Sequence, residues 1–139
     1  MTDFLRQLPL RFFEVPYEAS QIPAGDNGLG RGANCQRYAY AVLGYFGLNL
    51  PPYRSSDLWA DRVHTSMVEG SLEPLDLLLF GPTNSSYGAH VGLWTGEEGV
   101  LHLCRSVGVP SIWSLEQFAA QPDYRVLIGA KRLRALAKA

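Results

Sequence analysis

The segment from residue 34 to residue 47 constrains the fold of this chain most strongly. Its apolar residues recur at helical spacing and form one continuous apolar face: Cys35, Tyr38, Ala39, Val42, Leu43 and Phe46. Asn34 is a favourable N-cap, and Gly47 is a favourable stop at the other end. The pattern therefore predicts an amphipathic helix with Cys35 in its first turn, on the buried face.

The position of Cys35 at a helix start has a chemical consequence. Unpaired backbone N–H groups at a helix N-terminus stabilise a thiolate, and thiol pKa values fall to roughly 3.5–7.5 where positive partners add to this effect. A glycine-rich loop over residues 25–32 leads into the helix. We therefore expect Cys35 to be a nucleophile with a lowered pKa.

The remaining patterns predict helices first and strands afterwards. Residues 10–15 read as a short strand or an irregular segment, and Ser55 or Ser56 can cap a second helix that runs to Arg62. Five strands are expected over residues 76–80, 89–94, 100–104, 109–113 and 125–131, with a short capped helix over 114–118. This order predicts an α+β domain in which N-terminal helices pack on an antiparallel sheet of about five strands.

Size and charge narrow the class of protein. The 139 residues fit a single domain over 1–139, and 47% hydrophobic residues are enough for a core. A net charge of −1 without a basic stripe argues against nucleic-acid binding, and no apolar run is long enough to span a membrane. The N-terminus lacks the features of a signal peptide, so we expect a cytoplasmic protein as encoded, with export by another route left open.

The two cysteines do not indicate a disulfide framework or a metal site. A bridge between Cys35 and Cys104 would silence the thiol, and buried structural cysteine is the ordinary role for Cys104. The spacing of cysteine and histidine matches no common zinc motif. We therefore expect neither a metal nor a cofactor.

Two histidines on neighbouring predicted strands are the partners expected for Cys35. His90 begins the stretch His90-Val91-Gly92-Leu93-Trp94-Thr95-Gly96, and His102 stands twelve residues later. Side chains at alternate positions of a strand point to the same face, and both histidines have even numbers. A hairpin around residues 96–99 joins the two strands. The two side chains share a face only if the hairpin loop has an odd number of residues or contains a bulge.

If that condition holds, the three residues form a coherent set for nucleophilic catalysis. Cys35 is the nucleophile, and His90 takes its proton or forms an ion pair with the thiolate. His102 hydrogen-bonds the other ring nitrogen of His90 and fixes its orientation. The backbone N–H of Cys35, at the helix N-terminus, is available to the oxyanion of a tetrahedral intermediate.

At this point the sequence resembles the NlpC family of papain-like cysteine peptidases, which cut amide bonds in the peptide stems of peptidoglycan. The family's outline is Asp-Cys-Ser at a helix start, Leu-Pro followed by Ser or Thr, a Pro-Gly-Asp-Leu strand, a His-Val-Gly strand, and a third polar residue about twelve positions later. The matching stretches here are Asn34-Cys35-Gln36, Leu50-Pro51 with Ser55-Ser56, Leu72-Glu73-Pro74-Leu75-Asp76-Leu77, His90-Val91-Gly92-Leu93-Trp94-Thr95-Gly96, and His102. The resemblance covers roughly residues 15–115.

The resemblance implies a papain-like NlpC-type fold and a site with Cys35, His90 and His102 as catalytic residues. Further candidates for substrate or oxyanion binding come from the matched segments: Tyr17, Asn34, Ser55 and Ser56. Tyr17 corresponds to a tyrosine that the family places beside the thiol. The implied substrate is a peptidoglycan fragment or a small peptide, with no nucleic acid or membrane and with any protein partner unknown.

Three departures from the family pattern bear on the substrate. Asn34 keeps the cap but lacks the charge of the family's Asp, which helps to read a free amine on the stem peptide. Gln36 replaces the family's Ser, and Leu75 replaces the Gly of Pro-Gly-Asp. Asn34-Cys35-Gln36 is also similar to the Asn-Cys-Glu-His of the lecithin:retinol acyltransferase relatives, in which a His precedes the Cys. In this chain no histidine precedes Cys35.

Three functions are therefore weighed. The first is a hydrolase that cleaves an amide bond in peptidoglycan stems or in related γ-glutamyl or D-amino-acid peptides, during wall recycling, as a lysin or as an antibacterial effector. The second is an acyltransferase or thioesterase-like member of the same superfamily, which differs in its acyl acceptor. The third is a binding domain that kept the fold without catalysis.

Overall fold

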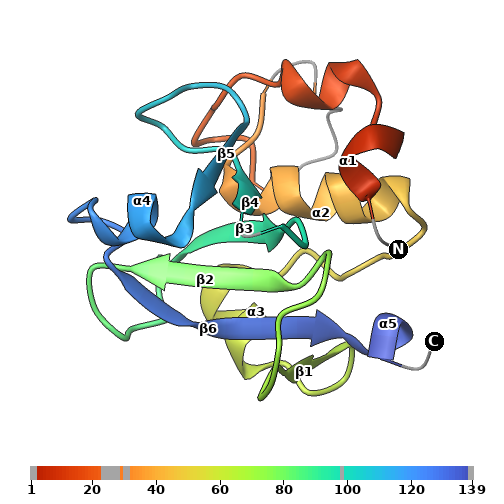
Figure 1. Cartoon of the computed structure of the whole chain (residues 1–139), viewed down its shortest axis with the longest axis vertical. Helices are drawn as coiled ribbons and strands as arrows, with labels where there is room; N and C mark the ends of the chain where they lie inside the picture. Colours follow the sequence, from red (N-terminus) through yellow and green to blue (C-terminus); the bar gives the residue numbers. More distant parts are fainter. Residues whose placement is uncertain (1–2, 23–28, 30–31, 98, 138–139) are drawn as a thin grey trace.

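A computed structural model describes residues 3–22, 29, 32–97 and 99–137 of the chain (Figure 1). The helices are α1 (Phe4–Gln7), the 3₁₀ helix η1 (Leu10–Phe13), α2 (Cys35–Tyr45), α3 (Ser55–Ala60), α4 (Leu115–Ala119) and α5 (Arg134–Ala137). The strands are β1 (Thr65–Met67), β2 (Leu77–Gly81), β3 (His90–Trp94), β4 (Gly99–His102), β5 (Ser111–Ser114) and β6 (Val126–Leu133). The predicted α+β class is confirmed.

The strands form one antiparallel sheet in the order β1-β6-β2-β3-β4-β5. The five strands expected from the sequence are all present, with ends that shift by no more than two residues. The sixth, β1, pairs with the end of β6 through Thr65↔Leu133 and Met67↔Lys131. Its three residues are too few to show an alternating pattern in the sequence, so it is recognised as a strand only from its pairing with β6.

Alternate residues of the strands divide the core into two parts. Odd-numbered side chains such as Leu79, Val91 and Leu101 join the cluster that contains α1, η1 and α2. Even-numbered side chains such as Phe80 and Val100 join a second cluster with Phe118 of α4. Figure 1 shows α1, η1 and α2 gathered on one side, with α4 at the edge near β5. The sheet is therefore covered on both faces, which is why its central strands are continuously apolar.

Helix α2 begins where the sequence predicts. The Asn34 side chain accepts a hydrogen bond of 2.8 Å from the backbone N–H of Arg37, and this satisfies one of the free donors of the first turn. The helix ends at Tyr45, one residue before the last position of the apolar pattern, and Gly47 follows with a φ of 78°. Gln36 and Arg37 are also buried, which the apolar pattern does not predict.

The shorter helices differ more from expectation. Helix α3 starts at Ser55 with Arg54 as its N-cap and ends at Ala60, two residues before Arg62. Helix α4 has the predicted cap, in which Ser114 and Gln117 satisfy each other's backbone N–H groups. Residues 10–13 form a 3₁₀ helix instead of a strand, and α1 precedes it. Most of the predicted loop over 25–32 lies outside the described residues.

An ion pair inside the fold fixes the start of β2. Both carboxylate oxygens of the fully buried Asp76 accept hydrogen bonds of 2.8 Å from Arg132 of β6. Leu75, just before it, has a φ of 73°, in the left-handed region that favours glycine. Leu75 thus has a backbone conformation that favours glycine, the residue that the resembled family pattern has at this position.

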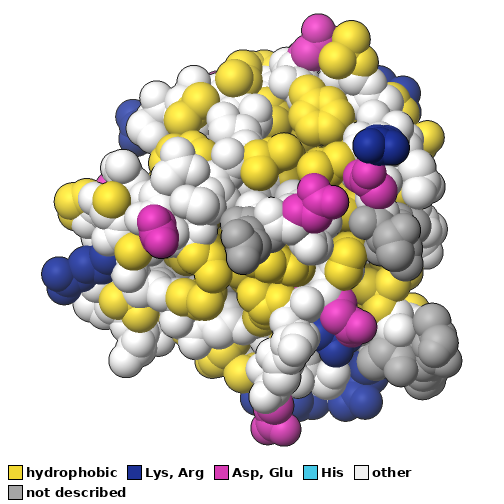
Figure 2. All heavy atoms as spheres, viewed as in Figure 1, with side chains coloured by type: hydrophobic (Ala, Val, Ile, Leu, Met, Phe, Trp, Pro, Cys, Tyr) yellow, Lys and Arg dark blue, Asp and Glu magenta, His cyan; other side chains and the backbone are white. Residues whose placement is uncertain are grey.

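The surface agrees with the charge pattern of the sequence. On the face drawn in Figure 2, Lys and Arg side chains lie in several separate places, with acidic side chains between them. Within the described ranges, no helix combines the length and the apolar character needed to cross a bilayer.

Candidate active site

The β3–β4 hairpin has the odd loop that the paired histidines require. Leu93 pairs with Leu101 and Trp94 with Val100, and the backbone N–H of Thr95 donates to the carbonyl of Gly99. Three residues separate Thr95 from Gly99 in the sequence, so even-numbered residues of both strands share a face. The expectation that His90 and His102 lie on the same face is therefore confirmed.

Gly92 lies between the two histidines and makes their contact sterically feasible. A Cβ atom at Gly92 would stand 2.5 Å from Cγ1 of Val100 and 3.3 Å from Cβ of His102. Any side chain there would push strand β4 outward. The glycine thus lets His102 reach across the hairpin toward His90.

A hydrogen bond joins the two imidazoles. Nε2 of His90 lies 2.9 Å from Nδ1 of His102, and the ring planes are nearly perpendicular at 89°. When His90 donates through Nε2, its Nδ1 is free to accept a proton, as a general base must. His102 then carries its own proton on Nε2, a buried atom without a hydrogen-bond partner among the described residues.

Aromatic rings enclose the His102 side of this pair. The ring of His102 lies 4.4 Å from Trp113 of β5 and 4.6 Å from Phe118 of α4, measured between centroids. Ring faces accept a weak N–H contact, which offers the Nε2 proton a partner other than oxygen. The surrounding rings hold His102 in one orientation.

Burial keeps both imidazoles neutral. Desolvation, followed by the neighbouring His102, lowers the pKa of His90 to about 3. Desolvation also lowers the pKa of His102 to about 4. At neutral pH the pair therefore holds two neutral rings, and His90 can accept a proton.

The thiol of Cys35 lies where strands β3 and β4 separate. Trp94 donates its backbone N–H to Asp76 ahead of β2, so odd-numbered residues of β3 direct their N–H groups toward β4. The β3–β4 ladder stops at Leu93↔Leu101, which leaves the N–H of Val91 without a strand partner. That N–H is one of the backbone groups that lower the pKa of the Cys35 thiol, so Cys35 lies near the residue that follows His90.

The pKa of the Cys35 thiol is shifted in the direction opposite to the one expected from the sequence. Burial raises the pKa of Cys35 to about 11, and the backbone N–H groups of Val91, Gln36 and Cys35 itself lower it by less. Arg54 adds a smaller lowering effect. The prediction of a lowered pKa was wrong because it counted the helix terminus and not the desolvation of the thiolate.

The sulfur of Cys35 makes no hydrogen bond to either ring nitrogen of His90 within the described part of the chain. Cys35 does lie near Val91, the residue after His90. Nε2 of His90 is hydrogen-bonded to His102, so Nδ1 is the ring nitrogen that remains to accept a proton from the thiol. Candidate catalytic groups are often further apart before substrate binds than during the reaction.

The structure places Tyr17 near the thiol of Cys35. Residue 17 forms a parallel β-bridge with Ala33, two residues before Cys35, and its N–H donates to the carbonyl of Gly108 over 2.8 Å. Burial and then the nearby Cys35 raise the pKa of Tyr17. Tyr17 also lines a cavity of about 320 Å³ together with Glu18 and Arg105.

The other candidates for substrate or oxyanion binding differ in whether their side chains already make hydrogen bonds within the protein. Asn34 is buried and its Oδ1 caps α2. Ser55 is buried too, since its hydroxyl donates to the carbonyl of Ser86 and accepts from the N–H of Ala89. Ser56 lines a cavity of about 260 Å³ next to Arg54 and Tyr87. Of the four candidates, Tyr17, Ser55 and Ser56 line a cavity, and the hydroxyl of Ser55 is already engaged in two hydrogen bonds.

Two further residues near the site were missed from the sequence. Tyr124 stacks on His90, and with Arg105 it lines a cavity of about 620 Å³. Arg105 also belongs to the neighbouring cavity beside Tyr17. Both residues lie in turns without a motif, so no local pattern could have indicated them.

Two other features lie apart from this chemistry. Cys104 is buried, as predicted, and its sulfur contacts the hydroxyl of Ser106 at 3.4 Å. In the described ranges no three His, Cys, Asp or Glu side chains are grouped to hold a metal ion.

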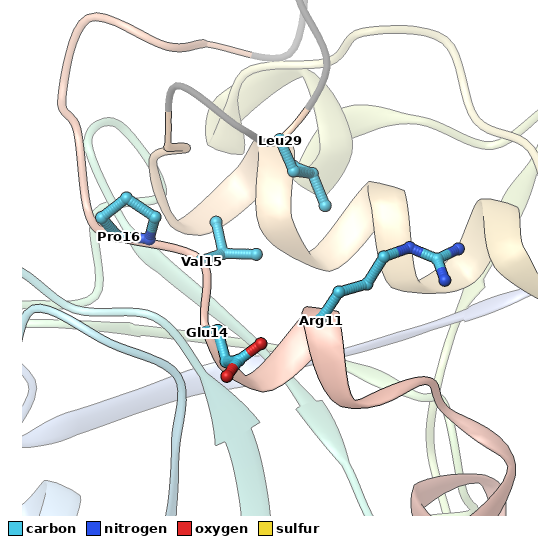
Figure 3. A pocket seen from close by; sticks show the side chains of 5 residues that line it. All are labelled: Arg11, Glu14, Val15, Pro16 and Leu29. Atoms are coloured by element: carbon cyan, nitrogen blue, oxygen red, sulfur yellow. The ribbon is translucent and has the colours of Figure 1, made fainter.

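A cavity of about 410 Å³ beside η1, drawn in Figure 3, includes none of the site residues. It is lined by Arg11, Glu14, Val15, Pro16 and Leu29.

Solved structures share this arrangement of helices and strands. A NlpC/P60 family protein from Bacillus cereus ATCC 10987 aligns with 73% of this chain at 19% sequence identity and a TM-score of 0.56. The NlpC/p60 domain of the peptidoglycan hydrolase SagA aligns with 78% of this chain at 21% identity and a TM-score of 0.53. The chain has the NlpC/P60 fold.

The NlpC/P60 fold confirms the fold expected from the resemblance. The alignment spans 85% of the SagA domain but only 32% of the Bacillus cereus protein, so the latter is much longer than the shared part. No protein-family model matches the sequence, and neither does any curated protein. The activity is therefore argued from the site itself.

Proposed function

We propose that this chain is a cysteine hydrolase that cleaves an amide bond in a peptidoglycan stem peptide or in a related γ-glutamyl or D-amino-acid peptide. The observation that carries the proposal is the arrangement around the β3–β4 separation. The N–H of Val91, the residue after His90, lowers the pKa of the Cys35 thiol, and Nε2 of His90 lies 2.9 Å from Nδ1 of His102. Nucleophile, base and orienting group thus occur in the order that a cysteine hydrolase requires.

In the proposed reaction, the proton leaves the thiol as the sulfur attacks. The raised pKa of Cys35 and the lowered pKa of His90 favour a neutral thiol beside a neutral imidazole in the resting state. His90 accepts the proton on Nδ1 during the attack and passes it to the amine that leaves. Water then attacks the thioester, with His90 again as the base, and the free thiol is restored.

The oxyanion formed in each step is placed at the start of helix α2. The backbone N–H groups of Cys35 and Gln36 lie close enough to the sulfur to lower the thiol pKa. They belong to the first turn, where N–H groups have no partner within the helix. These two donors are the proposed oxyanion hole.

The substrate is proposed to lie over the cavities that flank the thiol. Tyr17 and Arg105 border one side, and Arg54 and Ser56 border the other. Asn34, which is uncharged and engaged as a cap, does not supply a carboxylate for a free amine. We therefore propose a substrate that is not selected by a charged N-terminal amine at this position. The single-domain organisation, the compartment and the biological role remain predictions.

The test is digestion of purified peptidoglycan and of defined muropeptides, with the products read by mass spectrometry. We expect new amide-cleavage products from the wild type and none from Cys35→Ala. Cys104→Ala is the matched control, because it removes the other thiol and should leave the products unchanged. Products from both the wild type and Cys35→Ala would exclude Cys35 as the nucleophile.

The same samples separate the hydrolase from its rivals. Addition of an amine or alcohol acceptor would yield acyl-transfer products with an acyltransferase, whereas a hydrolase gives mainly the free acid. A binding domain would give no products, and Cys35→Ala would bind muropeptides as well as the wild type. The mass of each product identifies the bond that was cut.

A further inference from the structure

The ring of Tyr124 covers one face of the His90 imidazole. The two centroids are 4.5 Å apart and the planes differ by 26°, a stacked arrangement. His102 contacts the same imidazole edge-on, at 89°. His90 is therefore held by a hydrogen bond at one nitrogen and by a ring on its face.

Tyr124 is itself held in place from two sides. It lies in the turn between α4 and β6, where its backbone N–H donates to the carbonyl of Gln121 over 3.0 Å. Phe118 and Trp113 lie 6.1 Å and 6.3 Å from its ring. These are the rings that also enclose His102. A single aromatic cluster thus supports both imidazoles.

The outer side of Tyr124 faces open space. Its ring borders the cavity of about 620 Å³ that Arg105 and Asp123 also line. Within the described residues its hydroxyl makes no hydrogen bond. Burial, and then the neighbouring Cys104 and Cys35, raise the pKa of Tyr124 to about 12, so the hydroxyl is neutral at pH 7. The thiol is thus close enough to Tyr124 to affect its ionisation.

We propose that Tyr124 is a positioning residue for His90, which holds the imidazole with Nδ1 toward Cys35 and stabilises the imidazolium formed during attack. The inference rests on the proposed function of Cys35 and His90. The terminal torsion of a histidine is broad, and a stacked ring restricts it. The face of an aromatic ring also attracts a cation, so the stack is stronger when His90 is protonated than when it is neutral. It therefore favours the transition state over the resting state.

Two substitutions separate the ring from the hydroxyl. Tyr124→Phe keeps the stack and removes the hydroxyl, while Tyr124→Leu removes the stack. Tyr124→Met serves if the Leu variant does not fold, because its flexible side chain fills irregular space. Tyr45→Leu, at the far end of α2, is the control for the loss of an exposed tyrosine. Thermal melting establishes that each variant is folded.

The first readout is steady-state hydrolysis of the best muropeptide. We expect Tyr124→Leu to lower kcat about 10-fold with KM changed less than about 2-fold, and Tyr124→Phe and Tyr45→Leu to stay within about 2-fold of the wild type. Equal losses in the Phe and Leu variants would overturn the proposal, because the hydroxyl and not the ring would then matter. Unchanged kcat in a folded Leu variant would overturn it as well.

The second readout does not depend on activity. Nitrogen NMR of the imidazoles reports which ring nitrogen carries the proton and whether the ring moves between orientations. We expect one tautomer of His90, with the proton on Nε2, in the wild type and in Tyr124→Phe, and averaged shifts in Tyr124→Leu. An unaltered His90 spectrum in the Leu variant would refute the positioning role. If no variant hydrolyses muropeptides, this measurement still decides about Tyr124, while the proposed function fails by itself.

Discussion

The imidazoles of His90 and His102 are joined by a contact of 2.9 Å between Nε2 of the first and Nδ1 of the second. The contact crosses a hairpin whose three-residue loop puts both residues on one face. It leaves Nδ1 of His90 as the nitrogen that can accept a proton from Cys35. The register of the two strands therefore places His102 where it can fix the orientation of the His90 ring.

Replacement of His102 should impair catalysis without removing the nucleophile. In His102→Ala the Nε2 proton of His90 loses its acceptor, and the ring can then turn its Nδ1 away from the thiol. We expect kcat to fall by about 10²-fold or more, within the usual range for a lost acid–base function. His102→Asn offers a carbonyl acceptor and should retain more activity than His102→Ala. Equal activity in the wild type and the Ala variant would contradict the orienting role.

Gly92→Ala tests whether the close approach of the hairpin strands is needed. Its Cβ would meet Val100 at 2.5 Å, so β4 and His102 must shift. We expect a loss of about 1–3 kcal/mol in the free energy of unfolding, as for other overpacked cores, together with reduced hydrolysis. Denaturant unfolding and steady-state kinetics measure the two effects.

Gly70→Ala is the control for that substitution. A Cβ at Gly70 has no neighbour within 4 Å, and its backbone does not have a positive φ. Its free energy of unfolding should change by less than about 0.5 kcal/mol. If Gly92→Ala were as harmless as Gly70→Ala, the packing explanation for Gly92 would be wrong.

The thiol of Cys35 should react slowly at neutral pH. Because burial raises its pKa to about 11, the free enzyme holds a thiol and not a thiolate at pH 7. Alkylation of Cys35 by iodoacetamide, measured in Cys104→Ala, should accelerate continuously from pH 6 toward pH 10. A reactive plateau between pH 5 and pH 8 would instead indicate a preformed thiolate–imidazolium pair, and would contradict the mechanism proposed here.

The buried Lys131 predicts a pH dependence of stability. Its ammonium donates to the backbone carbonyls of Trp59 and Asp61, and burial, then Arg62, lower its pKa to about 8. Between pH 8 and the ordinary lysine value of about 10.4, the unfolded chain binds more protons than the folded chain. Lys131 should therefore raise the free energy of unfolding from pH 8 to pH 9.5, while the raised pKa of the Cys35 thiol acts in the opposite direction.

Lys131→Met supplies the comparison for this prediction. The variant has no ammonium to titrate, so its free energy of unfolding should fall relative to that of the wild type over the same interval. Above about pH 10 both proteins should lose stability, because burial raises the pKa of Tyr38 and Tyr40 and the unfolded chain then releases protons first. Parallel pH profiles for the two proteins from pH 8 to 9.5 would exclude Lys131 as the source.

The sequence by itself determined the elements whose signals are local. The cap at Asn34, the apolar period of α2 and the alternation of the central strands each depend on residues a few positions apart, and all three are present. The same patterns placed Cys35 at a helix start and made the face shared by His90 and His102 conditional on an odd loop. Strand β1 and helix α1 were not predicted, because segments of three or four residues are too short to show a periodic pattern.

Only the tertiary structure decided how these parts act on one another. The thiol pKa depends on desolvation by packed neighbours, which reverses the effect of the helix terminus. Tyr124 stacks on His90 from a turn with no motif, and the backbone of Val91, on a strand far from Cys35 in the sequence, lowers the thiol pKa. Such contacts depend on where distant segments meet in space, and local residue patterns carry no information about that distance.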